Sequence, residues 1–172
     1  MTIHATDPFG VPEEERSAVR RLRGRLPSAV TLWTALGPTG RPAGLTVAST
    51  VVVDGDPGHL LGVLDEESEV WEAIRDTGRF AMAPLRESDS QLADRFAGTM
   101  PAPGGPFVGA SWRETEFGPV LDSVSGWAGC RLELSRPIGW GLLVVATIER
   151  VEIDASVAAA PLIYFRGRYL GR

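Results

Sequence analysis

Residues 41–50 read RPAGLTVAST, and the interpretation of the whole chain starts from them. The run reads as a β-strand, yet it begins with proline, alanine and glycine and places Thr46, Ser49 and Thr50 among small side chains. A strand built only to fill a core favours larger β-branched or aromatic residues. Small residues and a glycine in a strand indicate that something approaches the backbone closely.

Short apolar segments bounded by turn residues surround this stretch. They predict strands at 29–36, 49–53, 59–64, 79–85, near Val120, and at 126–135, 140–153 and 162–165. Helical spacing predicts helices at 13–26, 68–76 and 88–97, and 98–111 is a Pro/Gly loop. Ser88 and Gln91 have capping-box spacing at the start of the third helix. Residues 1–12 are expected to be a poorly ordered tail and 13–172 a single domain. Short strands and few helices predict a mainly β protein, a barrel with helices outside it, with a mixed α/β sheet as the alternative.

Composition limits the classes of partner. The 172 residues carry 17 basic and 22 acidic side chains, a net charge of −5, which argues against nucleic-acid binding. The longest apolar run, 142–148, is too short to span a bilayer, and the first residues lack a signal-peptide pattern. A single cysteine, Cys130, excludes an internal disulfide. We therefore expect a soluble, cytoplasmic protein with no nucleic-acid or membrane partner.

Several kinds of catalytic site lack their motifs. His4 and His59 are the only histidines, and neither stands in an HExxH, G-x-S-x-G or CxxC context. Metalloenzyme and hydrolase functions are therefore disfavoured, and no metal site is expected.

Five blocks in a fixed order carry a resemblance. They are GLTVAST (44–50), HLLGVLDEESEVWEAIRDTGRFAMAPL (59–85), LADRFAG (92–98), AGCRLEL (128–134) and PLIYFRGRY (161–169). Each block is short, but their order and spacing over residues 18–169 are specific. On these blocks the chain resembles the flavin reductase-like family.

The resemblance implies the FMN-binding split-barrel fold and a homodimer with flavin bound near the subunit interface. It also implies hydride transfer from NADH or NADPH to FMN or FAD, with reduced flavin supplied to a partner monooxygenase in many members. The flavin carries this chemistry, so no catalytic side chain is expected. The alternative is a flavin-binding or carrier barrel without a nicotinamide reaction, or one adapted to another cofactor such as haem or a deazaflavin.

The family's cofactor positions map onto residues of this chain. Those implied to bind flavin are Pro42, Ala43, Gly44, Leu45, Thr46, Ala48, Ser49, Val63, Leu64, Asp65, Ser68, Arg95 and Phe96. Those implied to bind nicotinamide nucleotide are Tyr164, Phe165, Arg166 and Gly167. Small residues would let backbone groups reach the flat ring, hydroxyls would add donors, and Arg95 would neutralise phosphate.

Three departures from the family are visible. Glu69 and Val70 stand where family members often carry basic or hydroxyl residues near the flavin phosphate, and acidic residues crowd 65–69 here. Ala83 stands where asparagine is frequent. Gly139-Trp140-Gly141 replaces a Gly-Asp-His motif whose histidine is associated with nicotinamide binding, and Trp140 could instead stack on a ring or act as a hydrophobic lid.

Overall fold

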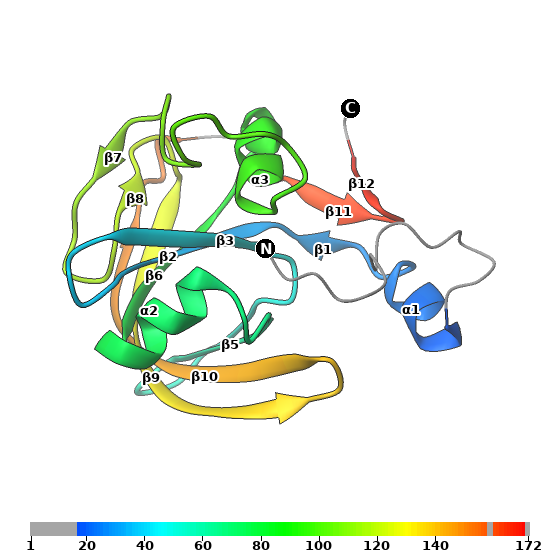
Figure 1. Cartoon of the computed structure of the whole chain (residues 1–172), viewed down its shortest axis with the longest axis horizontal. Coiled ribbons are helices and arrows are strands. Elements are labelled where there is room, and N and C mark those ends of the chain that lie inside the picture. Colours follow the sequence, from blue (N-terminus) through cyan, green and yellow to red (C-terminus); the bar gives the residue numbers. More distant parts are fainter. Residues whose placement is uncertain (1–16, 158–159, 171–172) are drawn as a thin grey trace.

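A computed structural model describes residues 17–157 and 160–170; the predicted tail at 1–12 lies outside them. The helices are α1 (Ala18–Arg23), α2 (Glu69–Thr77) and α3 (Ser90–Phe96), and a 3-10 helix at Glu87–Asp89 leads into α3. The strands are β1 (Ser28–Ala29), β2 (Thr31–Leu36), β3 (Pro42–Val47), β4 (Val51–Val53), β5 (His59–Leu64), β6 (Arg79–Pro84), β7 (Trp112–Arg113), β8 (Val120–Leu121), β9 (Gly126–Ile138), β10 (Gly141–Ile153), β11 (Ile163–Phe165) and β12 (Arg168–Tyr169). Figure 1 shows their arrangement.

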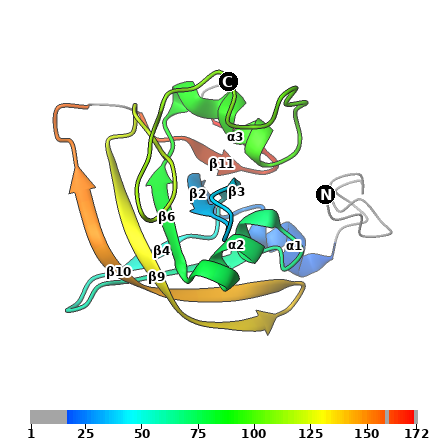
Figure 2. The ribbon, with the colours of Figure 1, turned by 60° about the vertical axis from the view of Figure 1, so that its left-hand side comes forward.

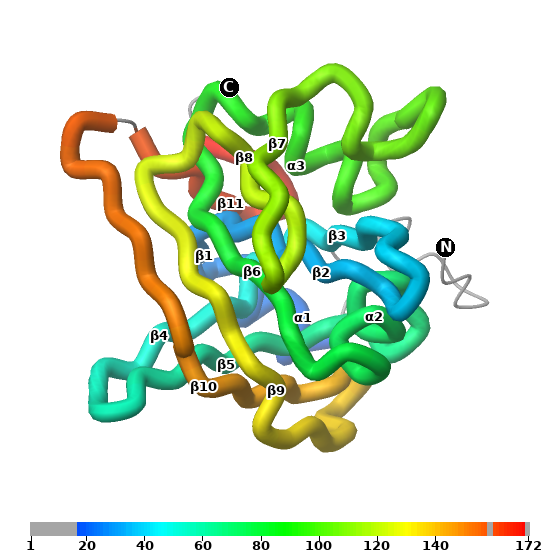
Figure 3. The backbone as a smooth tube through the Cα atoms, turned by 90° about the vertical axis from the view of Figure 1, so that its left-hand side faces the viewer, coloured from blue at the N-terminus to red at the C-terminus, as the bar shows by residue number. Residues whose placement is uncertain are grey.

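Seven strands form one curved sheet in the order β3-β2-β6-β9-β10-β5-β4. Every pairing between named strands is antiparallel, so the predicted mainly β class is confirmed and the mixed-sheet alternative is wrong. Figures 2 and 3 show how the long β9–β10 hairpin bends around the body of the protein. Two smaller sheets, β1-β11-β12 and β7-β8, lie outside it.

The curved sheet closes on itself between β3 and β5, where a side chain makes the hydrogen bonds in place of a backbone ladder. Ser49 follows β3, and its Oγ accepts a hydrogen bond from Val63 N at 2.9 Å and donates one to Val63 O at 3.0 Å. β3 and β5 are therefore joined by one hydroxyl at this point, and the barrel is split along the β3–β5 seam.

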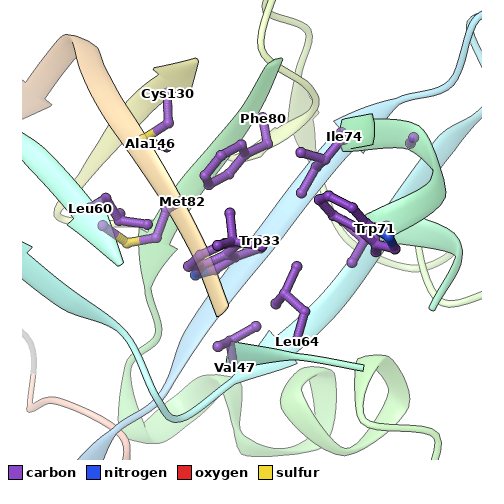
Figure 4. Packing of buried hydrophobic residues seen from close by; sticks show 14 of the residues in the cluster. Trp33, Val47, Leu60, Leu64, Trp71, Ile74, Phe80, Met82, Cys130 and Ala146 are labelled. Atoms are coloured by element: carbon purple, nitrogen blue, oxygen red, sulfur yellow. The ribbon is translucent and has the colours of Figure 1, made fainter. Parts of the chain in front are cut away.

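The barrel interior is filled by large side chains from the inner face of the sheet (Figure 4). Trp33 stacks on Phe80 with ring centroids 4.6 Å apart. Gly62 faces the same indole, and a Cβ there would lie 2.6 Å from a ring carbon of Trp33. Glycine in β5 is therefore required by close packing.

A second buried cluster covers the other face of β2 and β6. Leu32 and Ala83 belong to it, together with Phe96 of α3 and Trp127 of β9, whereas Trp33 and Met82 point into the barrel. Alternate residues of these central strands thus serve two cores. This double burial explains why 79–85 reads as a continuous apolar run.

The helix ends differ in part from the sequence prediction. α2 corresponds to the helix predicted at 68–76; Ser68 caps it and Gly78 ends it in a left-handed conformation. Before α3, Arg86 and Asp89 form the capping interaction, so the capping-box spacing of Ser88 and Gln91 is not used. The described part of the helix predicted at 13–26 covers Ala18–Arg23, and residues 13–16 lie outside the described residues.

Candidate functional site

Strand β3 brings together the elements that carry the predicted flavin residues. Thr46 Oγ1 donates to Ala93 O of α3 at 2.8 Å, and Ser49 is bonded to Val63 of β5. The N-terminal end of α2 approaches through an ion pair, with Arg41 3.4 Å from Glu69. The predicted flavin residues at 63–68 and 96 therefore lie near β3, which together with the residues that follow it carries those at 42–49.

β3 also offers unpaired backbone. It ends the strand order of the seven-stranded sheet, so within residues 17–157 and 160–170 the N–H and C=O groups on its outer edge have no partner strand. Gly44, Leu45 and Thr46 are half-buried, and Pro42 is exposed. A flat ligand with a polar edge can reach this backbone, because small side chains stand beside it. The residues present therefore fit the polar edge of an isoalloxazine ring.

The close approach to Gly44 has an identified cause within the protein. A Cβ on Gly44 would lie 2.7 Å from Phe96 Cε1 and 3.4 Å from Phe107 Cζ. Phe96, Phe107 and Trp112 form an edge-to-face aromatic cluster beside this position. Packing alone accounts for the glycine, and its proximity to flavin stays a prediction.

The hydroxyls of the opening stretch are engaged within the protein. Thr46 and Ser49 donate to the carbonyls of Ala93 and Val63, and Thr50 Oγ1 accepts from Trp33 Nε1 at 3.0 Å. A hydroxyl has one donor proton, so Thr46 and Ser49 have only acceptor capacity left for a ligand.

Acidic residues lie at the start of α2, and Arg41, which was not among the predicted site residues, lies beside them. Ser68 Oγ accepts from Trp71 N at 3.3 Å and donates to Asp65 O at 2.6 Å, so its hydroxyl caps the helix. Arg41 reaches Glu69 from the start of the quoted stretch. No local pattern links residues 28 positions apart, and only the fold places this guanidinium at the helix N-terminus.

The two predicted flavin residues of α3, Arg95 and Phe96, lie on different faces of the helix. Phe96 contacts Gly44, whereas Arg95 Nη1 donates to Val108 O at 2.5 Å. The structure therefore brings Phe96 against β3 and turns Arg95 toward the loop that follows α3.

The predicted nicotinamide residues lie at the end of β11, which contains Tyr164 and Phe165, and in the turn to β12, which contains Arg166 and Gly167. Tyr164 packs against the second buried cluster, which also contains Phe96, and its ring lies 5.6 Å from that of Tyr169. Arg166 has a positive φ of 50°, its backbone N–H donates to Gly24 O at 3.0 Å, and its guanidinium lies over the Phe165 ring. This group is thus linked to the β3 region through shared packing.

Two of the residues that depart from the family pattern, Trp140 and Ala83, lie in very different surroundings. Trp140, at the tip of the β9–β10 hairpin, is 98% exposed. A Cβ on the neighbouring Gly141 would lie 2.6 Å from Val63 Cγ1, so the hairpin tip rests on a predicted flavin residue. Ala83 is buried in β6 within the second cluster.

Other reactive groups add no site within the described residues. No group of three or more His, Cys, Asp or Glu side chains there could hold a metal ion. Burial raises the pKa of the Cys130 thiol to about 12, which keeps it protonated and unreactive. None of the helices in this part of the chain is long and apolar enough to cross a membrane.

Comparison with known proteins connects this geometry to a family. The chain is 31% identical over 166 residues to an FMN reductase (NADH), RutF 2, of Methylorubrum extorquens, covering 96% of this chain and 92% of that protein. It is 30% identical to a flavin reductase (NADH) of Kitasatospora aureofaciens, covering 86% and 77%. A nitrilotriacetate monooxygenase component B homologue of Mycobacterium thermoresistibile superposes with a TM-score of 0.79 at 26% identity, covering 88% and 83%. The flavin reductase like domain profile matches residues 23–171, and the chain therefore belongs to the flavin reductase-like family.

Proposed function

We propose that this protein is a flavin reductase that transfers a hydride from NADH to FMN or FAD. The observation that carries the proposal is the free outer edge of β3, around which β5, α2 and α3 gather the predicted flavin residues. Two relatives at 30% and 31% identity are named NADH-dependent flavin or FMN reductases, which supports NADH as the donor. The bound flavin supplies the hydride-accepting chemistry, and the protein binds and orients the two reactants.

Each element has a part in binding. The backbone of residues 42–46 would bond the polar edge of the flavin ring, and Arg41 is placed to offset the acidic residues at the start of α2 near a phosphate. The turn at Tyr164–Gly167 is the proposed place for the nicotinamide nucleotide. These assignments rest on the position of each segment in the fold and on its match to the family blocks.

A homodimer is the proposed working form. The outer face of the sheet carries an apolar patch, defined here as Val51, Leu61, Val63, Leu134, Leu143 and Val145, which cross-strand pairing places side by side on four strands. Val51 is 55% exposed and Leu134 47%, and a surface of this kind in water favours an interface. Val63 belongs both to the patch and to the predicted flavin residues, so a second copy seated there would place flavin near the interface.

Two further assignments complete the proposal. The structural relative from Mycobacterium thermoresistibile is named as a monooxygenase component, which supports a partner monooxygenase that receives reduced flavin from this protein. A cytoplasmic location accords with the single reduced cysteine, Cys130, since disulfides belong to oxidising compartments.

The test is the absorbance of NADH during incubation with the protein and either FMN or FAD. Flavin-dependent loss of the absorbance establishes the reductase and shows which flavin it prefers. Quenching of flavin fluorescence without NADH oxidation would instead identify a flavin carrier. If neither signal changes, the proposed function is wrong.

A further inference from the structure

A polar cleft lies on the side of α3 where Arg95 points. It has a volume of about 330 Å³ and is bounded by one face of the 3-10 helix and α3, by the loop before β7, and by the end of β8. Its lining residues are Ser88, Asp89, Gln91, Leu92, Arg95, Gly109, Ala110, Ser111, Leu121, Asp122 and Ser123. A hydrogen bond from Asp122 N to Ser111 O, 3.1 Å long, holds the two chain segments of the far wall together.

Most polar side chains of the cleft have no hydrogen-bond partner in the described part of the chain. Among the residues that the structure describes, none is hydrogen-bonded to the side chains of Ser88, Gln91, Asp122 or Ser123. Asp89 differs, because Arg86 binds both of its carboxylate oxygens. The cleft thus presents one free carboxylate, hydroxyls and an amide to a ligand.

Arg95 supplies an unpaired positive charge. Its guanidinium donates to Val108 O, and within residues 17–157 and 160–170 no carboxylate lies within ion-pair distance of it. A guanidinium has five N–H donors in a fork that matches phosphate oxygens, and one carbonyl uses only part of them.

We propose that this cleft binds the adenosine 5′-phosphate portion of a dinucleotide, an inference that rests on the proposed function. Both FAD and NADH contain this portion. A carboxylate such as Asp122 accepts hydrogen bonds from ribose hydroxyls, and Arg95 binds the phosphate. Leu92 and Leu121, both buried, also line the cleft and give its wall apolar residues.

The size of the cleft agrees with this portion. Ligand pockets range from about 300 to 1,000 Å³, and 330 Å³ is at the lower end. The space therefore suits a mononucleotide rather than a whole dinucleotide. The flavin or nicotinamide half would then lie outside the cleft, on the neighbouring surface.

The cleft and the β3 site lie on different faces of α3. Phe96 on one face of α3 contacts Gly44, and Arg95, the preceding residue, lines the cleft on the adjacent face. A dinucleotide bent around α3 can therefore place its reactive ring near β3 and its adenosine 5′-phosphate portion beside Arg95.

The first experiment is calorimetric titration of the whole protein with AMP. We expect binding, and we expect Asp122→Asn to weaken it about tenfold because a charged acceptor for the ribose hydroxyls is lost. Glu114→Gln is the matched control: it removes one negative charge from an exposed residue outside the cleft and leaves AMP binding unchanged. Absence of AMP binding, or equal binding by wild type and Asp122→Asn, overturns the proposal.

The second experiment identifies which dinucleotide is bound. If FAD is the source, wild type binds FAD more tightly than FMN, and Asp122→Asn reduces this difference. If NADH is the source, its KM is lower than that of reduced nicotinamide mononucleotide, and the same variant reduces that difference instead. Should neither difference depend on Asp122 while NADH still reduces FMN, the cleft proposal fails and the proposed function stands.

Discussion

The ring of Phe96 occupies the space that a side chain on Gly44 would need, with its Cε1 atom 2.7 Å from the ideal Cβ position. The contact joins α3 to the edge strand β3. It fixes the distance between the two elements that border the candidate site, because neither can move closer.

Gly44→Ala is expected to lower the free energy of unfolding by about 1–3 kcal/mol, since the new methyl group overpacks against Phe96. Gly37→Ala is the control, because a Cβ there meets its nearest atom, Arg41 O, at an ordinary 3.5 Å. Denaturant unfolding measures both. Combining Gly44→Ala with Phe96→Leu should cost less than the sum of the single changes. Equal stability of the two glycine variants would contradict this account.

Arg41→Ala is expected to weaken FMN binding several-fold and to leave riboflavin binding nearly unchanged, because riboflavin lacks the phosphate. Glu69→Gln should act in the opposite direction by removing a like charge. Quenching of flavin fluorescence gives the affinities for FMN and for riboflavin. Glu114→Gln is the control for Glu69→Gln, because it changes the net charge by the same amount at an exposed residue elsewhere. If Arg41→Ala weakens both flavins equally, the guanidinium does not contact the phosphate.

Val51→Lys is expected to convert the proposed dimer into monomers, because it places a charge at the β4 end of the apolar patch. Val151→Lys is the matched control: Val151 is 56% exposed against 55% for Val51, but it lies on β10 outside the patch. Sedimentation velocity distinguishes the two states. A dimer that survives Val51→Lys and dissociates with Val151→Lys would place the interface elsewhere.

The buried thiol of Cys130 is expected to make stability fall at alkaline pH. Burial raises its pKa from 9.0 to about 12, so above pH 9 the unfolded chain loses the proton while the folded chain retains it. The free energy of unfolding should therefore decrease by up to about 1.4 kcal/mol per pH unit from this group, and the contribution is complete only below pH 9. Denaturant unfolding between pH 8 and 10.5 measures the slope. Cys130→Ala should flatten it, whatever its stability at pH 8.

Local patterns were sufficient for the longer strands and for the family, but not for the two-residue strands β7 and β12. Alternation in 29–36 and 59–64 and the apolar run at 79–85 correspond to β2, β5 and β6. The helix predicted at 68–76 corresponds to α2, Glu69–Thr77. These features depend on neighbours in sequence, and so a single chain reveals them.

Relations between distant segments could not be read in this way. Arg41 lies beside Glu69 only because β3 is placed against α2, and the partner of Gly44 comes from α3. Arg86 and Asp89 form the cap before α3 in place of the expected capping box of Ser88 and Gln91. Their bidentate ion pair lies at the N-terminal end of the helical segment. The polar cleft had no sequence signal, because its walls come from residues 88–95 and 109–123.

The bond between Ser49 and Val63 has a consequence for how the barrel opens. Elsewhere two neighbouring strands share a ladder, and separating them breaks several backbone bonds together. At the β3–β5 seam, separating Ser49 from Val63 breaks the two bonds of one hydroxyl. The Val63 amide should therefore exchange its proton for deuterium faster than the amides of central β2. Local opening of the barrel would begin at the border of the proposed flavin site, at little cost to the global fold.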